Sequence, residues 1–148
     1  MTTIAYRDGV LAADSIISVG GSLGSHTDKI ARRADGHMAG GAGTCAYWQR
    51  FCTWFMAGEN GDPPEAKVSA DFLDRGVIFR PDGSFEVFEP EGMSVQRGNY
   101  YAMGSGRAEA LGAMFAGADA PTAVRAGIEH DSNSGGSVMV LSHAGEPA

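Results

Sequence analysis

The sequence has little of what marks several common classes of protein. It holds only two cysteines, Cys45 and Cys52, and their spacing in a predicted helix separates them by about 10 Å along its axis, too far for a disulfide. We expect both on an apolar helix face, as core thiols. No apolar run reaches the roughly 20 residues that span a bilayer, and no secretory signal opens the chain. These absences lead us to expect a cytoplasmic protein.

Basic residues are also scarce. Eleven lysines and arginines face 18 acidic residues, for a net charge of -7, which argues against a nucleic-acid partner because such proteins carry a basic patch. The histidines at 26, 37, 130 and 143 show no metal-ligand spacing, so we expect no metal and no cofactor. With 148 residues, of which 43% are hydrophobic, the chain is expected to form a single domain spanning 1–148.

Glycine, in contrast, is abundant, and it marks turns along the whole chain. An Asp-Gly pair, a good hairpin signal, lies between short apolar runs at Asp8, at Asp35 and at Asp82. The predicted hairpins pair 2–6 with 10–13, 29–33 with 37–41, and 77–80 with 84–88. Residues 15–27 are polar and glycine-rich and are expected to form loops or a short ribbon, and further short strands are expected at 100–104 and 137–142.

Apolar residues at helical spacing predict helices. The first, 44–56, has a stripe made of Trp48, Phe51, Cys52, Phe55 and Met56. A second is expected at 107–116, with Ala110, Leu111, Met114 and Phe115 on one face, followed by a third that Asp119 caps and Pro121 begins. Hairpins with helices grouped between them predict an α+β protein, with two sheets face to face and helices outside.

The first residues, Met1-Thr2-Thr3, carry a chemical hypothesis. Amide cleavage needs a nucleophile and a base in contact, and a threonine that is itself the first residue supplies both, as its hydroxyl and its free α-amine. That amine titrates at about 7.7–8.0, so it is a base near neutral pH. Met1 is commonly removed before a small residue, which makes Thr2 the candidate terminus. Taken alone, these residues are a weak signal, because many chains begin in this way without any catalytic role for the first threonine.

Four segments taken together resemble the proteasome β-subunit family and its bacterial relative HslV, which are N-terminal nucleophile hydrolases. Their order and spacing fit over nearly the whole chain, although each alone is a weak signal. The segments are Met1-Thr2-Thr3-Ile4, Leu11-Ala12-Ala13-Asp14-Ser15, Thr27-Asp28-Lys29-Ile30 with the stretch from Met38 to Cys45, and Gly104-Ser105-Gly106 with the stretch from Asp131 to Gly136.

The resemblance implies a four-layer αββα sandwich and a set of roles. Thr2 would be the nucleophile and, through its α-amine, the base, with Lys29 beside it and Asp14 paired to Lys29. Gly40 would donate its backbone N–H to the oxyanion. Ser105, Asp131 and Ser134 would form a hydrogen-bond network around the amine.

Physical chemistry gives these residue types a reason, and it also leaves simpler alternatives. An ammonium beside Thr2 would disfavour a second positive charge and so keep the α-amine neutral. However, Asp14 and Lys29 are equally compatible with a strand-end salt bridge of little energetic value. The two serines often serve turns, and Asp131 also suits a helix end.

The same resemblance implies a specificity pocket. Met38 and Ala42 correspond to positions that line the pocket for the residue before the scissile bond. A methionine with a small neighbour would accept an apolar side chain, so a modest apolar preference is expected. The alternative is that Met38 is simply a core residue.

The chain departs from the family by being shorter. Relatives carry a second long helix between the segments that correspond to Met56 and Val77, whereas about twenty residues remain here, interrupted by Pro63-Pro64. Residues 71–74 are expected to form at most one turn. The resemblance implies a homo-oligomeric ring and suggests an unfolding ATPase as partner, but the missing helix puts a double ring in doubt.

The functional expectation is a threonine-type endopeptidase that cleaves peptides or unfolded proteins through an acyl-enzyme. Two alternatives stay open, since a fold does not fix a function. One is a catalytically inactive structural or scaffold ring subunit with the same fold. The other is an amidase that acts on a small molecule.

Overall fold

The computed structural model describes residues 2–19 and 22–145. Its elements are short strands and three helices. This is the mixed α+β character that the sequence predicts. In chain order they are β1 (Ile4–Arg7), β2 (Val10–Ala13), β3 (Ile16–Val19), β4 (Ser22–His26), β5 (Ile30–Arg32), β6 (Met38–Ala42), α1 (Cys45–Met56), β7 (Arg75–Phe79), β8 (Phe85–Glu89), β9 (Gly92–Gln96), β10 (Tyr100–Met103), α2 (Arg107–Phe115), α3 (Ala120–His130) and β11 (Met139–Ser142).

Strands from both ends of the chain form one antiparallel sheet in the order β10-β1-β2-β11. The central hairpin β1–β2 pairs Ile4 with Ala13 and Arg7 with Val10. Its two-residue turn places both Asp8 (φ 53°) and Gly9 (φ 75°) in the left-handed region, the backbone that a tight hairpin requires. The predicted first hairpin is therefore confirmed, and it places the N-terminal residues at the centre of the sheet.

The second sheet is also antiparallel and follows chain order, β5-β6-β7-β8-β9. The two other predicted hairpins are confirmed as β5–β6 and β7–β8. Within the glycine-rich segment after β2, the strands β3 and β4 pair as a two-stranded ribbon. The edge strand β9 was not predicted. Its apolar residues Met93 and Val95 alternate with Ser94 and Gln96, but all five residues are exposed, so the strand buries no side chain in the core.

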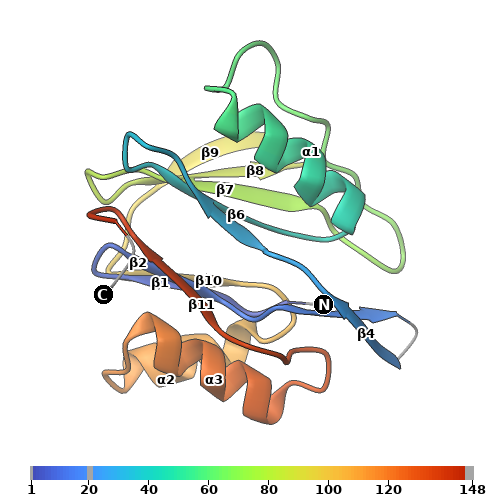
Figure 1. Ribbon diagram of the computed structural model, residues 1–148, viewed down its shortest axis with the longest axis vertical. Helices are drawn as coiled ribbons and strands as arrows, with labels where there is room; N and C mark the ends of the chain where they lie inside the picture. The colour runs from blue at the N-terminus through green and yellow to red at the C-terminus, as the bar shows by residue number, and fades with distance from the viewer. Residues whose placement is uncertain (1, 20–21, 146–148) are drawn as a thin grey trace.

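The two sheets lie face to face, with α1 covering the outer side of the second sheet and α2 and α3 covering the first (Figure 1). Apolar side chains from both sheets fill the space between them, and Tyr6 stacks on Phe79 with ring centroids 4.5 Å apart. Among the buried residues of this central core are Ile4, Leu11, Met38, Val77, Phe79, Phe85 and Met103.

Helix α1 packs closely on its sheet because the sheet offers glycine beneath its rings. A Cβ on Gly76 would lie 2.5 Å from the Phe51 ring, so only glycine fits there without a shift. The buried side of α1 consists of Tyr47, Trp48, Phe51 and Phe55. This side is turned relative to the predicted stripe, since Tyr47 is buried and Met56 is 47% exposed.

Two other expectations about helix faces are wrong. Phe115, the last residue of α2, is 83% exposed, because the helix buries Ala110 and Met114 instead. The expectation for Cys45 is wrong because it is exposed, whereas Cys52 is half-buried and packs against the hydrophobic cluster beneath α1. Cys45 is the first residue of α1, at an end of the helix that opens towards a cavity rather than onto the core.

The segment 57–74 contains no helix, as the shortened sequence predicts. Residues 71–74 do not form a helical turn either; Leu73 instead makes an isolated antiparallel bridge with Val68. Separately, no helix in the described ranges combines the length and the apolar character needed to cross a membrane.

Charged residues join the end of α1 to its sheet. Glu59 accepts hydrogen bonds from Arg33 (2.7 Å) and from two nitrogens of Arg80 (both 2.8 Å). The bonds from Arg80 lower the pKa of Glu59; burial acts in the opposite direction, and the bond from Arg33 lowers the pKa further. A carboxylate whose pKa falls on folding stabilises the folded state above its ordinary pKa and loses that effect as pH falls through its folded pKa.

We therefore predict that Glu59→Gln lowers the free energy of unfolding by about 1–3 kcal/mol at neutral pH, since it removes charged hydrogen bonds. The difference from the wild type should narrow as the pH falls below the ordinary glutamate value of 4.5. Urea unfolding across this pH range measures it. Glu129→Gln, at an exposed position of α3, serves as the control, and equal stability of Glu59→Gln and wild type at neutral pH would contradict the prediction.

Candidate active site

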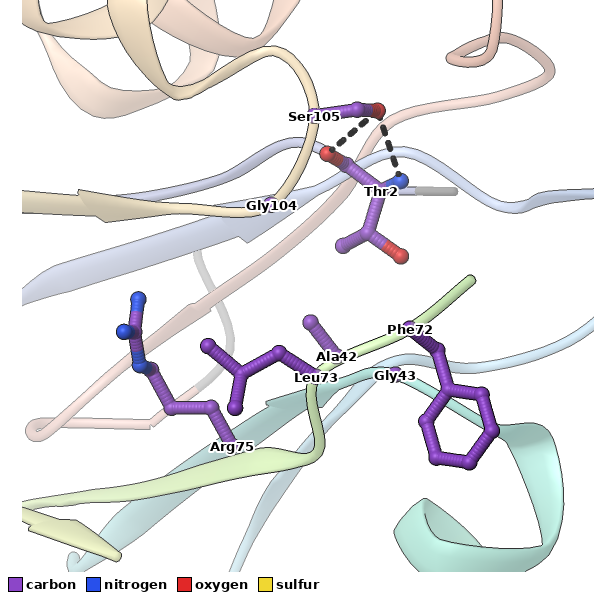
Figure 2. A pocket seen from close by; sticks show the side chains of 8 residues that line it. All are labelled: Thr2, Ala42, Gly43, Phe72, Leu73, Arg75, Gly104 and Ser105. Carbon is purple, nitrogen blue, oxygen red and sulfur yellow. Dashed lines mark hydrogen bonds between the residues drawn. The ribbon is translucent and has the colours of Figure 1, made fainter. Parts of the chain in front are cut away.

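The two threonines that precede β1 point to opposite sides of their sheet, as alternate residues in an extended chain do. Thr2 directs its side chain towards the second sheet, where Ala42 and Gly43 lie (Figure 2). Thr3 is fully buried on the helix side, where it lies against Gly106 and Gly127. Close packing therefore fixes the first residues of the chain, and Thr2 is the one that faces open space.

The main chain of Thr2 is held by the turn that follows β10. Its carbonyl oxygen accepts a hydrogen bond from the N–H of Gly106 at 3.1 Å. Gly104 (φ 98°) has a conformation that favours glycine, and a Cβ there would overlap the Thr2 carbonyl. The turn can thus contact Thr2 because Gly104 lacks a side chain.

Asp14 lies at the end of β2 and is 1% exposed. Its Oδ1 accepts hydrogen bonds from the Lys29 ammonium and from the Thr3 N–H, both at 2.9 Å, and its Oδ2 accepts one from the Gly135 N–H at 3.0 Å. The Asp14 and Lys29 side chains are 0% and 6% exposed. The pair is thus a buried ion pair that receives further hydrogen bonds, and not the surface salt bridge that the sequence left as an alternative.

Burial lowers the pKa of Lys29 below its ordinary value, although the Asp14 carboxylate acts in the opposite direction. The ammonium therefore holds its proton less tightly than an exposed lysine does. Lys29 and Thr2 line the same cavity, so the charge of this ammonium acts on whatever chemistry takes place at Thr2.

Ser105 connects Thr2 to Asp131. Its hydroxyl lies 3.2 Å from the Thr2 nitrogen and 2.6 Å from Oδ2 of Asp131. A hydroxyl carries one proton, and donation to a carboxylate at this short distance is the stronger bond. Ser105 consequently donates to Asp131 and accepts from the Thr2 nitrogen.

A second serine completes the network. Ser134 donates to the same Asp131 oxygen at 2.6 Å, and its hydroxyl lies 2.6 Å from that of Thr3. Burial alone would raise the pKa of Asp131, but the hydrogen bonds from the two serines outweigh it and hold that pKa below the ordinary value. Asp131 is also the C-terminal cap of α3, so it has the helix-end position that the sequence offered as an alternative.

Two cavities flank Thr2, and both are lined by Thr2, Ala42 and Gly43. The Lys29 cavity, of about 300 Å³, is further lined by Ile16, Ile17, Thr27, Lys29, Gly41, Thr44, Cys45 and Trp48. The Arg75 cavity, of about 230 Å³, is further lined by Phe72, Leu73, Arg75, Gly104 and Ser105. A chain that passes over Thr2 would have room for a side chain on either side of it.

The structure separates the two residues predicted to line a pocket. Ala42 lines both cavities, whereas Met38 is 0% exposed and packs in the core between the sheets. This corrects the expectation for Met38: its side chain extends into the core and lines neither cavity. The simpler interpretation, a core methionine, describes it.

Gly40 is buried, and a Cβ there would lie 3.3 Å from both Ile30 and Ile4. It lines neither cavity, whereas the following residues Gly41, Ala42 and Gly43 do. Direct contacts or a shared cavity thus join most of the predicted site residues, namely Thr2, Asp14, Lys29, Ser105, Asp131 and Ser134. Gly40 is not among them, because it precedes the first residue of β6 that lines a cavity.

Sequence reasoning missed several residues of this site. Thr3 and Gly135 take part through backbone and hydroxyl groups that no motif marks. Phe72, Leu73 and Arg75 form a wall of the Arg75 cavity, although the sequence indicated only a turn followed by a strand there. In the described part of the chain, no three histidine, cysteine, aspartate or glutamate residues are grouped so that they could hold a metal ion.

Comparison with known proteins gives the fold a precedent. No protein-family profile and no curated protein matches the sequence. Among solved structures, Thiobacillus denitrificans BPH in complex with epoxomicin is similar, with a TM-score of 0.65 and 23% identity over 95% of this chain and 96% of that one. Thiobacillus denitrificans BPH itself gives a TM-score of 0.67, also at 23% identity, over 95% of both chains. The likeness shows that the fold is shared.

The hydrogen bonds of Asp14 generate a prediction about stability. Asp14→Ala deprives a buried ammonium and two backbone N–H groups of this acceptor, which should cost about 3–5 kcal/mol. Lys29→Met should cost less, because the carboxylate keeps both backbone donors. Urea unfolding of the two variants gives the ranking, with the exposed Asp62→Ala as control. A larger cost for Lys29→Met would show that Asp14 is not the centre of this network.

Proposed function

We propose that this protein is a threonine-type endopeptidase with the αββα fold of N-terminal nucleophile hydrolases, related to the proteasome β subunits and HslV. Removal of Met1 would leave Thr2 as the nucleophile. The proposal is supported by the fold shared with Thiobacillus denitrificans BPH, which is known in complex with epoxomicin, a proteasome inhibitor.

The observation that carries the proposal is the surroundings of Thr2. Its hydroxyl faces two cavities, its nitrogen is hydrogen-bonded to Ser105, and the buried Asp14–Lys29 pair lies at the Lys29 cavity. Titratable groups whose pKa values are shifted by burial and by hydrogen bonds gather at active sites, and here Lys29 and Asp131 are two such groups.

In the proposed reaction the Thr2 α-amine takes the hydroxyl proton as the Oγ1 atom attacks the carbonyl carbon of a peptide bond. The tetrahedral intermediate collapses as the C–N bond breaks, and the leaving nitrogen takes the proton from the α-ammonium. Water then attacks the ester carbon and gives a proton to the amine; the bond between this carbon and Oγ1 breaks, the acid is released, and Oγ1 takes the proton back from the α-ammonium. The hydroxyl is thereby regenerated.

Each neighbour has a task in this scheme. The Lys29 ammonium disfavours protonation of the α-amine and favours alkoxide character on the Thr2 oxygen. Ser105, held by Asp131, accepts an N–H of the amine and so leaves its lone pair for the hydroxyl. A backbone N–H near Gly40 is assigned to the oxyanion, and one such donor is typically worth about 3–4 kcal/mol of barrier.

The scheme requires a free amine. In a chain that retains Met1 the Thr2 nitrogen is an amide without a basic lone pair, so that form would be an inactive precursor. Met1 lies outside the described residues. The proposed assembly is a homo-oligomeric ring with an unfolding ATPase as a candidate partner, and the helix-free segment 57–74 is where subunit packing would differ from that of longer relatives.

Covalent labelling tests the function. Protein whose mass shows loss of Met1 should gain the mass of one epoxomicin molecule per chain and should cleave a panel of fluorogenic peptides. Thr2→Ala should show neither reaction. Lys29→Met should reduce the rate by at least about 100-fold, as loss of a key electrostatic group does, while its circular dichroism stays that of a folded protein.

Two outcomes of this experiment would favour the alternative functions, the inactive ring subunit and the small-molecule amidase. A processed protein that neither binds epoxomicin nor cleaves peptides would be an inactive ring subunit. Labelling with turnover of small amides only would indicate the amidase.

The pH profile provides a further prediction. Activity should rise as the α-amine loses its proton, near or below its ordinary value of about 7.7–8.0. It should fall again as Lys29 loses its proton, and because burial lowers that pKa the alkaline limb of kcat/KM should lie below the ordinary lysine value of 10.5. A profile that stays flat past that value, with the circular dichroism unchanged, would contradict the role given to Lys29.

A further inference from the structure

The Arg75 cavity contains a single charged residue among the described residues that line it, and that residue is a cation. Arg75 begins β7 and extends with Leu73 from the wall opposite Thr2 (Figure 2). The side chains of Ala42 and Leu73 contribute apolar surface, and Gly43, Phe72, Gly104 and Ser105 also line the cavity. A side chain entering here would meet an apolar surface first and a guanidinium beside it.

The guanidinium retains capacity to bind an anion. The Arg75 side chain is 25% exposed, and its Nε–H, which is itself buried, has no hydrogen-bond acceptor within the described part of the chain. The carboxylate of Glu89 lies 3.6 Å from this nitrogen. That is ion-pair distance but too long for a hydrogen bond. Arg75 also interacts with Tyr101 through a side-chain hydrogen bond.

The proposed chemistry at Thr2 indicates whether the Arg75 cavity binds the part of a substrate before or after the cleaved bond. In the proposed function the α-amine passes its proton to the leaving nitrogen, so the leaving portion must lie on the side of the amine. The Thr2 nitrogen is hydrogen-bonded to Ser105, and Ser105 lines the Arg75 cavity and not the Lys29 cavity. The Arg75 cavity thus lies on the leaving side.

We propose that the Arg75 cavity selects substrates in which the residue after the scissile bond carries a carboxylate, and that Arg75 is the specificity-determining residue. This inference rests on the proposed function. The carboxylate would belong either to a glutamate or aspartate side chain or to the C-terminus of a substrate cleaved at its last bond. The apolar wall favours glutamate over aspartate, because the longer side chain contacts Leu73 while its carboxylate reaches the guanidinium.

The test uses processed full-length protein whose Thr2 binds epoxomicin. A mixed peptide digest, read by mass spectrometry, first locates a cleaved bond. Internally quenched peptides then vary only the residue after that bond, as Glu, Asp, Gln, Ala or Lys. We expect kcat/KM for the Glu peptide to exceed that for the Gln peptide by about two- to fivefold, the range for a partly exposed ion pair. The ratio should fall when sodium chloride is raised from about 0.05 to about 0.5 M.

A second pair of peptides separates the two sources of the carboxylate. Both end with alanine directly after the cleaved bond, one with a free C-terminal acid and the other with an amide. A larger contrast for this pair than for Glu against Gln would assign the cavity to the substrate's C-terminus.

Variants test the residue itself. Arg75→Met, which keeps an unbranched apolar stem and removes the charge, should bring the Glu/Gln ratio close to one. Glu89→Gln removes the competing carboxylate and should raise the ratio. Arg125→Met, at an exposed position of α3, should leave it unchanged. If Arg75→Met does not fold, the Glu89→Gln result and the salt dependence of the wild type still decide the matter.

The outcomes distinguish this inference from the proposed function. A protein that cleaves peptides with equal rates for Glu and Gln, and for the acid and the amide, overturns the role of Arg75 alone. A protein that neither cleaves peptides nor binds epoxomicin overturns both.

Discussion

The structure depends on one buried carboxylate. Asp14 receives the Lys29 ammonium and the backbone N–H groups of Thr3 and Gly135, so it joins the start of the chain, the approach to the second sheet and the loop after α3. A buried charge is tolerated only when its bonds are complete, which makes the arrangement of these three segments interdependent. The hydrogen bond from Thr3 to Asp14 also fixes the position of Thr2, because Thr2 is its neighbour in the chain.

The site is also built from every layer of the fold. The Ser105 turn leads into α2 and Asp131 ends α3, while Ala42 ends β6 in the other sheet. A site distributed in this way is rigid only if the layers pack tightly. Glycines at the closest approaches, such as Gly76 under Phe51, let the layers come near enough. Packing far from Thr2 therefore contributes to its geometry.

The sequence was informative where local chemistry decides the structure. Asp-Gly turns predicted the hairpins, and a resemblance of ordered short segments brought Thr2, Asp14, Lys29 and Ser105 together in advance. The sequence did not predict which side chains are buried where two layers of the fold pack together. The periodic stripe of α1 gave no information on which residues the sheet would cover, so Met56 was misplaced. Met38 was assigned by correspondence alone, whereas its burial in the core follows from the pairing of two sheets that no local pattern encodes.

The opposite orientation of Thr2 and Thr3 has a consequence for maturation. The Thr-Thr pair looks chemically redundant, as though trimming by one residue too many would merely substitute one nucleophile for another. It would not, because the Thr3 hydroxyl is enclosed against the helices and hydrogen-bonded to Ser134, out of reach of any peptide. Under the proposed function, an aminopeptidase that cut one bond too far would therefore produce a chain that begins with threonine but has no reactivity.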